Sequence, residues 1–264
     1  MSNSCNQNPI LSNTAEIADN IGWVKNTLLR WSRFEQWFRM NKTVFFNSFE
    51  EYFDEIKSIW SKLENPNRII PFCTPLLHNP KFLIIGKNHS NNFDPYDGVE
   101  NNRIADSFSR SIAEENTFLK HKHPFAKGLK RVVKSINQEY GDLKITQEWL
   151  GTNRCAIQTN SGGLGLEIEN HPKYKKSQEE MDKLLKSFIS FIKPKNVILT
   201  GLYACELYYP GKRLMDMKSK KVLFKKGSSE TFNLIPVEHF SLNYNTQKII
   251  DRLKNAIEER HCEL

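Results

Sequence analysis

The stretch that decides the fold is Lys81–Ser90, which reads KFLIIGKNHS. The apolar run 82–85 is stopped by Gly86 and followed at once by polar residues. A short apolar run with this ending predicts a buried strand that delivers polar side chains at its carboxyl end. Ligands of open α/β sheets bind outside the carboxyl ends of the strands. The end of this strand is therefore the first candidate site.

Three further strands are expected from apolar runs, each followed by polar residues: 154–159, 196–200 and 233–237. Apolar residues at helical spacing predict helices at about 125–136, 178–192, 201–209 and 246–260. Ser177 and Glu180 are read as the capping residues of the second of these helices. The alternation predicts a three-layer α/β/α fold with a central, mostly parallel, four-stranded sheet. A basic stretch at 212–228 is read as hairpin-like.

The chain is expected to have three parts: a disordered tail at 1–12, an N-terminal helical extension at 13–66, and an α/β domain at 67–264. Within the extension, Ser48 and Glu51 form a capping box that starts a helix, and Asn65-Pro66 ends it. An earlier aromatic helix, to about Met40, either packs on the main body or binds a partner. Both alternatives stay open.

Composition favours a polyanionic partner, because the net charge is +8 and the pI is about 9.1. Basic residues cluster at 212–226 and again at 173–176, where they either neutralise phosphates or form a solvated surface without a partner. The five cysteines show no Cys-x-x-Cys spacing, which argues against zinc and iron–sulfur sites and favours free thiols. No apolar run is long enough for a membrane span and no signal peptide is evident, so we expect a cytoplasmic protein.

Four short motifs lie in order on the expected strand ends: GKNHS at 86–90, QTNSG at 158–162, TGLYA at 200–204 and EHFS at 238–241. In that order and spacing the chain resembles the uracil-DNA glycosylase superfamily, over roughly residues 70–260. The asparagine in the first motif is similar to the mismatch-specific and single-strand-selective branches. The resemblance implies a monofunctional DNA glycosylase that works without cofactor or metal. We also expect a monomer.

The resemblance implies two catalytic residues. Asn88 would hold the water that attacks C1′ of the deoxyribose. His239 would donate a hydrogen bond to O2 of the departing pyrimidine, where negative charge develops. Ser241, in the same loop as His239, would contact a phosphate.

Base and DNA contacts follow from the same resemblance. Gly86 and Ser90 would line the base pocket, Asn160 would read the base edge, and Phe108, or its competitor Phe93, would stack on the flipped base. Leu242, rather than Tyr244, would fill the hole left in the duplex. Lys220 and Lys221 would contact DNA phosphates.

Departures from the family pattern bear on the substrate. His89 and Phe240 replace two prolines, and Ser90 stands where uracil-specific members have a tyrosine that blocks bulk at C5 of the pyrimidine. The base is therefore expected to be uracil or a C5-modified pyrimidine, such as glucosylated hydroxymethylcytosine of phage DNA, and the purpose repair or antiviral defence. The alternatives are a catalytically weak DNA-binding module on the same scaffold and another nucleotide-handling hydrolase that uses His89 or His239.

Overall fold

The structure is a computed structural model that describes residues 47–62, 72, 74, 76–87, 124–139, 149–156, 172–225, 227–241 and 246–258. All of them belong to one compact unit, Phe45–Leu264. Its strands are β1 (Phe82–Gly86), β2 (Trp149–Asn153), β3 (Asn196–Thr200), β4 (Lys220–Leu223) and β5 (Thr231–Val237). Its helices are α2 (Phe49–Trp60), α5 (Pro124–Glu139), α7 (Pro172–Ile192), α8 (Gly201–Cys205) and α9 (Thr246–Glu258), with the 3-10 turn η2 (Leu214–Asp216).

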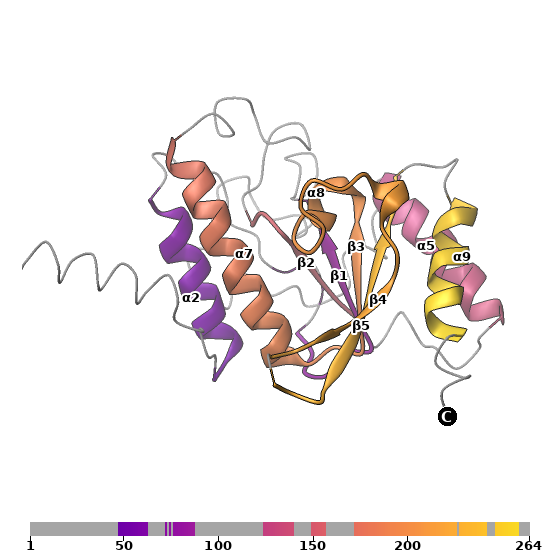
Figure 1. Cartoon of the computed structure of the whole chain (residues 1–264), viewed down its shortest axis with the longest axis horizontal. Helices are drawn as coiled ribbons and strands as arrows, with labels where there is room; N and C mark the ends of the chain where they lie inside the picture. Colours follow the sequence, from indigo (N-terminus) through magenta and orange to yellow (C-terminus); the bar gives the residue numbers. More distant parts are fainter. Residues whose placement is uncertain are drawn as a thin grey trace, which may run out of the picture. The chain divides into compact units, whose positions relative to one another are not determined.

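The strands form one sheet in the order β2-β1-β3-β5-β4 (Figure 1). The first four run parallel and β4 pairs antiparallel with β5. The expected α/β class with a mostly parallel sheet is confirmed. The expected number of strands is wrong, since the described part of the chain has five. The additional strand, β4, comes from the basic stretch that was read as hairpin-like, and it forms an edge of the sheet.

The position of β2 corrects the sequence prediction. The strand occupies 149–153 instead of 154–159, and it pairs with β1 along its whole length, from Phe82 opposite Trp149 to Gly86 opposite Asn153. Gly and Asn are poor strand formers, so the sequence WLGTN gave little sign of a strand. Pairing and burial override that weak preference, because every residue of β2 is buried.

The strand order contains a topological switch between β1 and β3. From β1 the chain passes through α5 to β2 on one side of β1, and from β2 it passes through α7 to β3 on the other side. Connections that leave neighbouring parallel strands in opposite directions open a crevice at their carboxyl ends. The carboxyl ends of β1 and β3 are thus where the architecture favours a ligand site.

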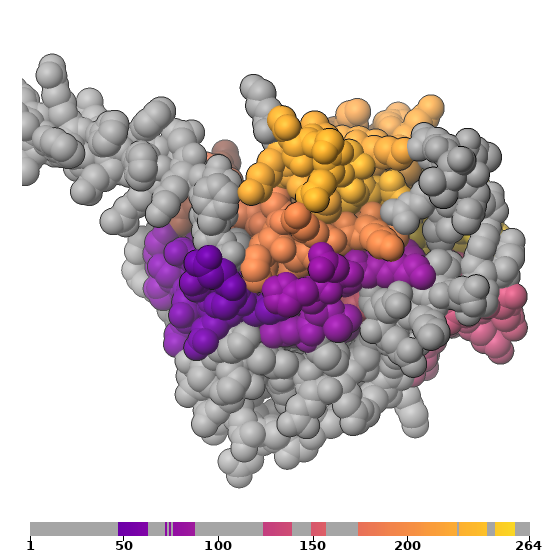
Figure 2. Space-filling view, turned by 90° about the horizontal axis from the view of Figure 1, so that it is seen from below, coloured from indigo at the N-terminus to yellow at the C-terminus, as the bar shows by residue number. Residues whose placement is uncertain are grey.

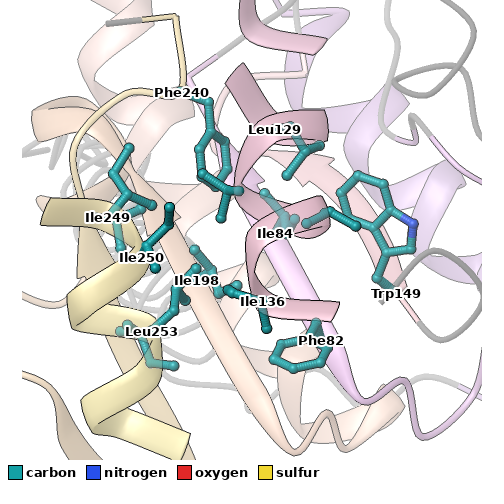
Figure 3. Close-up of a cluster of buried hydrophobic side chains, with 14 of the residues drawn as sticks. Phe82, Ile84, Leu129, Ile136, Trp149, Ile198, Phe240, Ile249, Ile250 and Leu253 are labelled. Carbon is teal, nitrogen blue, oxygen red and sulfur yellow. The ribbon is translucent and has the colours of Figure 1, made fainter. Parts of the chain in front are cut away.

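The main core cluster joins α5 and α9 to alternate residues of the parallel strands (Figure 3). Strand side chains alternate between the two faces of a sheet, so Phe82 and Ile84 of β1 and Ile198 of β3 lie on the same face. Phe240, from the loop after β5, points into this cluster and is 1% exposed. Phe240 is therefore a core anchor for its loop.

A second helical pair, α2 and α7, packs through aromatic rings. Tyr52 stacks on Phe188 with 3.9 Å between ring centroids. The expected start of α2 is confirmed: Ser48 Oγ accepts from Glu51 N at 3.2 Å, while the Glu51 carboxylate accepts from Asn47 N at 2.8 Å. The expected cap of α7 is wrong. The helix begins at Pro172, which leaves Ser177 buried inside it.

Figure 2 views the end of the molecule at which the parallel strands begin, opposite to their carboxyl ends. Backbone hydrogen bonds tie the segment before β1 to the turn between α7 and β3: Asn79 N donates to Ile192 O at 2.8 Å and Lys195 N to Pro80 O at 3.1 Å. These bonds fix the starts of β1 and β3 relative to each other. The carboxyl ends of the two strands are consequently held in register.

Candidate functional site

Four residues lie side by side at the carboxyl ends of the parallel strands, and we call them the tip row: Asn153, Gly86, Thr200 and Val237. Gly86 is opposite Asn153, and Thr200 is opposite Val237. Ile85 is paired with Leu199, so Gly86 and Thr200 follow side by side. Each member is an even number of residues from a strand residue of the α5–α9 core cluster, so the row faces that side of the sheet.

His239 lies just beyond the tip row, two residues after β5. Its ring is 5.2 Å from that of Phe125, the second residue of α5, and it lies against Gly201 at the start of α8. A Cβ built on Gly201 would stand 3.4 Å from His239 Cβ, and Gly201 has a φ of +78°, which a larger residue rarely adopts. The glycine of the TGLYA motif is therefore required by the turn, since a Cβ there would only be in ordinary van der Waals contact with the histidine.

Ser241 fixes the orientation and tautomer of the histidine ring. Ser241 Oγ is 2.6 Å from His239 Nδ1, and the backbone N–H of Ser241 points at the same nitrogen from 3.4 Å. An N–H can only donate, so Nδ1 is the acceptor and the proton of the neutral ring sits on Nε2. In this tautomer the Nε2–H lies on the side of the ring away from Ser241.

Gly86 allows a buried asparagine to pack against it. A Cβ on Gly86 would lie 2.6 Å from Asn153 Oδ1, closer than real Cβ contacts come. Asn153 is 5% exposed and ends β2, so it is the asparagine that stands at this strand tip. Sequence reasoning missed it, because the strand was expected five residues later and Asn160 was taken as the tip residue.

On the opposite face of the strand ends lies a cluster that sequence reasoning also missed, which we call the arginine cluster. Its centre, Arg154, directly follows β2, and its side chain is only 9% exposed. Nε and Nη2 donate to the two carboxylate oxygens of Asp182 at 2.9 and 2.7 Å. Nη1 donates to Glu206 at 2.8 Å and to Tyr203 O at 2.6 Å. The two carboxylates compensate the buried charge.

Phenols complete the arginine cluster. The guanidinium carbon lies 4.7 Å from the centre of the Tyr203 ring. The Tyr203 hydroxyl donates to Gln178 Oε1 at 2.8 Å and is 2.7 Å from the hydroxyl of Tyr174. Burial raises the pKa of both phenols above the ordinary tyrosine value. Burial lowers the pKa of Arg154, but the hydrogen bonds and the charge of its acidic partners, Asp182 foremost, together outweigh burial and raise that pKa. Two neutral phenols and a permanently charged arginine result.

A sequence signal for this cluster exists in hindsight. Gln178 and Asp182 are four residues apart on α7, and Tyr203 and Glu206 are three residues apart around the end of α8. Such spacings place side chains on one helix face. Nothing in the sequence, however, indicates that both faces meet Arg154.

Several expected site residues lie outside the described residues: Asn88, Ser90, Phe93, Phe108, Asn160, Leu242 and Tyr244. Of the described candidates, Gly86, His239 and Ser241 are brought together at the switch-point end of the sheet. Lys220 and Lys221 lie on the edge strand β4, where Lys220 is opposite Leu234. His239 comes five residues after Leu234, so Lys220 is roughly 16 Å from His239 along the strand at about 3.3 Å per residue.

Basic residues closer to the tip come from the segment between α8 and β4. Arg252 of α9 donates to Leu214 O at 3.5 Å and to Pro236 O at 2.9 Å, which holds η2 beside the end of β5. Lys212 and Arg213, just before η2, are exposed there. The Nζ atom of Lys220 lies 4.4 Å from the centre of the Tyr209 ring.

Two cysteines are described, Cys155 and Cys205, and both are buried free thiols. Burial raises the pKa of Cys205 to about 12, so it is not a reactive thiolate at neutral pH. Among the described residues no group of three or more His, Cys, Asp or Glu side chains could hold a metal ion. Within the same part of the chain, no helix is long and apolar enough to cross a membrane.

Comparison with known proteins adds no relative: no family model matches the chain, and no curated protein matches it either.

Proposed function

We propose that the chain is a monofunctional DNA glycosylase of a three-layer α/β/α architecture with an N-terminal helical extension, acting as a monomer in the cytoplasm. The observation that carries the proposal is the His239–Ser241 pair beside Gly201, at the switch-point end of a parallel sheet. A histidine locked with its N–H outward in such a crevice suits stabilisation of an anion that forms during reaction.

In the proposed reaction the N-glycosidic bond of a flipped pyrimidine nucleotide breaks and its electron pair departs with the base. Negative charge then develops on O2 of the pyrimidine, and His239 Nε2–H donates a hydrogen bond to that oxygen. A neutral imidazole suffices for this role, with Ser241 as the hydrogen-bond donor to Nδ1. No proton transfer from the histidine is needed, and the released anion takes its proton from water.

The sugar is left as an oxocarbenium-like cation, and a water adds to C1′ to give an abasic site and a proton released to solvent. In the sequence, Asn88 comes two residues after Gly86, the last residue of β1. An amide oxygen there would hold the water by hydrogen bonding without acting as a strong base. This role remains a proposal from the sequence motif.

Base recognition has two candidate asparagines. Asn160 comes from the sequence motif, whereas Asn153 ends β2 in the tip row beside Gly86. Of the two, Asn153 is the one that the structure describes, at the carboxyl end of β2. Phe108 would stack on the flipped base, and Ser90 would leave space at C5 for uracil or a larger substituent, such as that of glucosylated hydroxymethylcytosine.

Contacts with DNA would spread outward from the crevice. Lys212 and Arg213 beside the end of β5 would meet the phosphates nearest the flipped nucleotide, and Lys220 and Lys221 those farther along the duplex. Leu242 would fill the vacated space in the stack. Ser241 would have to exchange its bond to His239 before its hydroxyl could donate to a phosphate.

The test is a glycosylase assay with duplexes and single strands that carry uracil opposite guanine, thymine opposite guanine, or glucosylated hydroxymethylcytosine. Released base is measured by chromatography and abasic sites by alkaline cleavage. Release of at least one of these bases by the wild type, lost in Asn88→Ala, supports the proposal. Binding of DNA without release of any base contradicts it and favours a non-catalytic binding module.

A further inference from the structure

A buried hydroxyl in the tip row has no hydrogen-bond partner. Thr200 ends β3 and is 1% exposed, and its Oγ1 makes no hydrogen bond to any described residue. Buried hydroxyls in folded proteins almost always have a partner, because losing hydrogen bonds to water is costly unless they are replaced. An exception at a strand tip therefore needs an explanation.

Thr200 also does not form the hydrogen bond that its position at the start of α8 would allow. It is the N-cap of α8, where a threonine oxygen usually accepts from a backbone N–H of the first turn, yet it makes no such bond. The side chain faces the α5–α9 side of the sheet with the rest of the tip row. Its hydroxyl thus caps neither α8 nor any other described group.

The neighbours of Thr200 are the residues proposed to carry the chemistry. On one side lies Gly86, which leads to Asn88, and on the other lies Val237, two residues before His239. The next residue, Gly201, is the one in contact with His239. Thr200 consequently stands between the strand that would hold the water and the strand that would hold the departing base.

We propose that Thr200 is a specificity-determining residue, whose hydroxyl takes its hydrogen-bond partner from the bound pyrimidine nucleotide. This inference rests on the proposed function, which supplies the nucleotide. The hydroxyl donates to a polar oxygen of the ligand, so the free protein carries an unsatisfied group and the complex does not. The free protein is therefore less stable than it would be if the Thr200 hydroxyl had a partner, and that partner is gained only when the nucleotide binds.

Thr200→Val tests the inference, because valine matches threonine in shape and lacks the hydroxyl. The free variant should melt at the same temperature as the wild type or up to about 4 °C higher, since removing an unpartnered buried hydroxyl is neutral or stabilising. Its kcat/KM for base release should fall about tenfold, the loss of one neutral hydrogen bond. Thr200→Ser, which keeps the hydroxyl, should stay within about threefold of the wild type.

The matched control is Thr74→Val. Thr74 is fully buried, but its Oγ1 accepts from Gly151 N at 2.9 Å. This variant should melt lower by about 2–4 °C while its kcat/KM stays unchanged, because it leaves a buried N–H without a partner. Substrates are the duplexes with uracil opposite guanine or glucosylated hydroxymethylcytosine, whichever the wild type cleaves.

Two results would overturn the role of Thr200: a drop in melting temperature like that of Thr74→Val, which would reveal a partner inside the protein, or an unchanged kcat/KM. Failure of the proposed function looks different. If the wild type releases no base from any substrate, the glycosylase assignment falls and the nucleotide falls with it as the partner of Thr200. The comparison of melting temperatures then still reports whether the free protein satisfies the hydroxyl.

Discussion

The two faces of the strand ends differ in how completely their polar groups are satisfied. On one face, Arg154 donates four hydrogen bonds to Asp182, Glu206 and Tyr203 and lies against the Tyr203 ring. On the other, Ser241 Oγ lies 2.6 Å from His239 Nδ1, and Thr200 Oγ1 has no partner among the described residues. Asn153 and Arg154 are consecutive residues, yet they belong to opposite faces.

We infer from this difference that one face supports the fold and that the other binds and converts the substrate. A densely hydrogen-bonded buried network fixes backbone positions. A buried hydroxyl without a partner among the described residues, at a switch point, leaves a hydrogen bond to be completed by something that binds. The arginine cluster therefore holds β2 and α8 in place, while the tip row and His239 are the side on which we expect substrate.

Removing His239 is the most direct test of the proposed difference between the two faces. His239→Ala should lower kcat for base release about 10²–10³-fold, the usual loss when one donor to a developing oxyanion is removed. The melting temperature should stay within about 2 °C, since the half-buried ring sits in a loop anchored by Phe240. Ser241→Ala is the matched variant: it frees the ring to choose the other tautomer and should lower kcat about tenfold. Equal kcat values in all three proteins would contradict the assignment.

Removing Arg154 should have the opposite signature. Arg154→Met leaves the carboxylates of Asp182 and Glu206 without their cation and should lower the free energy of unfolding by about 3 kcal/mol, as expected for breaking a largely buried ion pair. Urea unfolding measures the loss. The control is Arg213→Met, whose pair with Asp216 is exposed and should contribute no more than about 1 kcal/mol. A stable Arg154→Met protein without activity would contradict this structural role and would assign Arg154 to the reaction.

Gly86 joins the two regions. Its substitution should lower the free energy of unfolding by less than that of Arg154. Gly86→Ala brings a methyl group within 2.6 Å of Asn153 Oδ1 and should lower the free energy of unfolding by about 1–3 kcal/mol, the usual range for overpacking. The double variant Gly86→Ala, Asn153→Ala removes the clash. It should recover part of the loss beyond additivity in a double-mutant cycle of urea unfolding. Strict additivity would show that the close approach does not matter.

The smallest effect concerns alkaline pH. Burial raises the pKa of Tyr203 and Tyr174 in the folded state, so their neutral forms are retained there while the unfolded chain ionises. The stability they contribute is therefore complete below about pH 10, the ordinary tyrosine value, and is lost as pH rises above it. Tyr203→Phe should make this decline shallower in urea unfolding measured between pH 8 and 11. An identical decline in both proteins would contradict the neutral-phenol description.

The sequence predicted the parts of the fold that depend on apolar runs and helical spacing. β1, β3 and the start of α2 at Ser48 follow the prediction closely, because burial and capping are local properties of the chain. β2 was misplaced because WLGTN has weak strand preference and is held by pairing with β1. Distant contacts decide such segments, and a single sequence does not show them.

The same distinction applies to the candidate site. His239 and Ser241 were expected at the site because a short motif follows the apolar run of β5. Thr200, although part of the TGLYA motif, and Arg154 were given no role, since a threonine before a glycine and an arginine after a strand have no meaning until neighbouring strands are aligned. Misplacing β2 also directed attention to Asn160 and away from Asn153.

The most direct test of the central claim is release of free base from duplexes carrying uracil, thymine or glucosylated hydroxymethylcytosine, measured in parallel for the wild type and His239→Ala. The account predicts release of at least one base by the wild type, with an abasic site left behind, and about 10²–10³-fold slower release by a normally folded His239→Ala protein. No release by the wild type, or equal rates for both proteins, would contradict it.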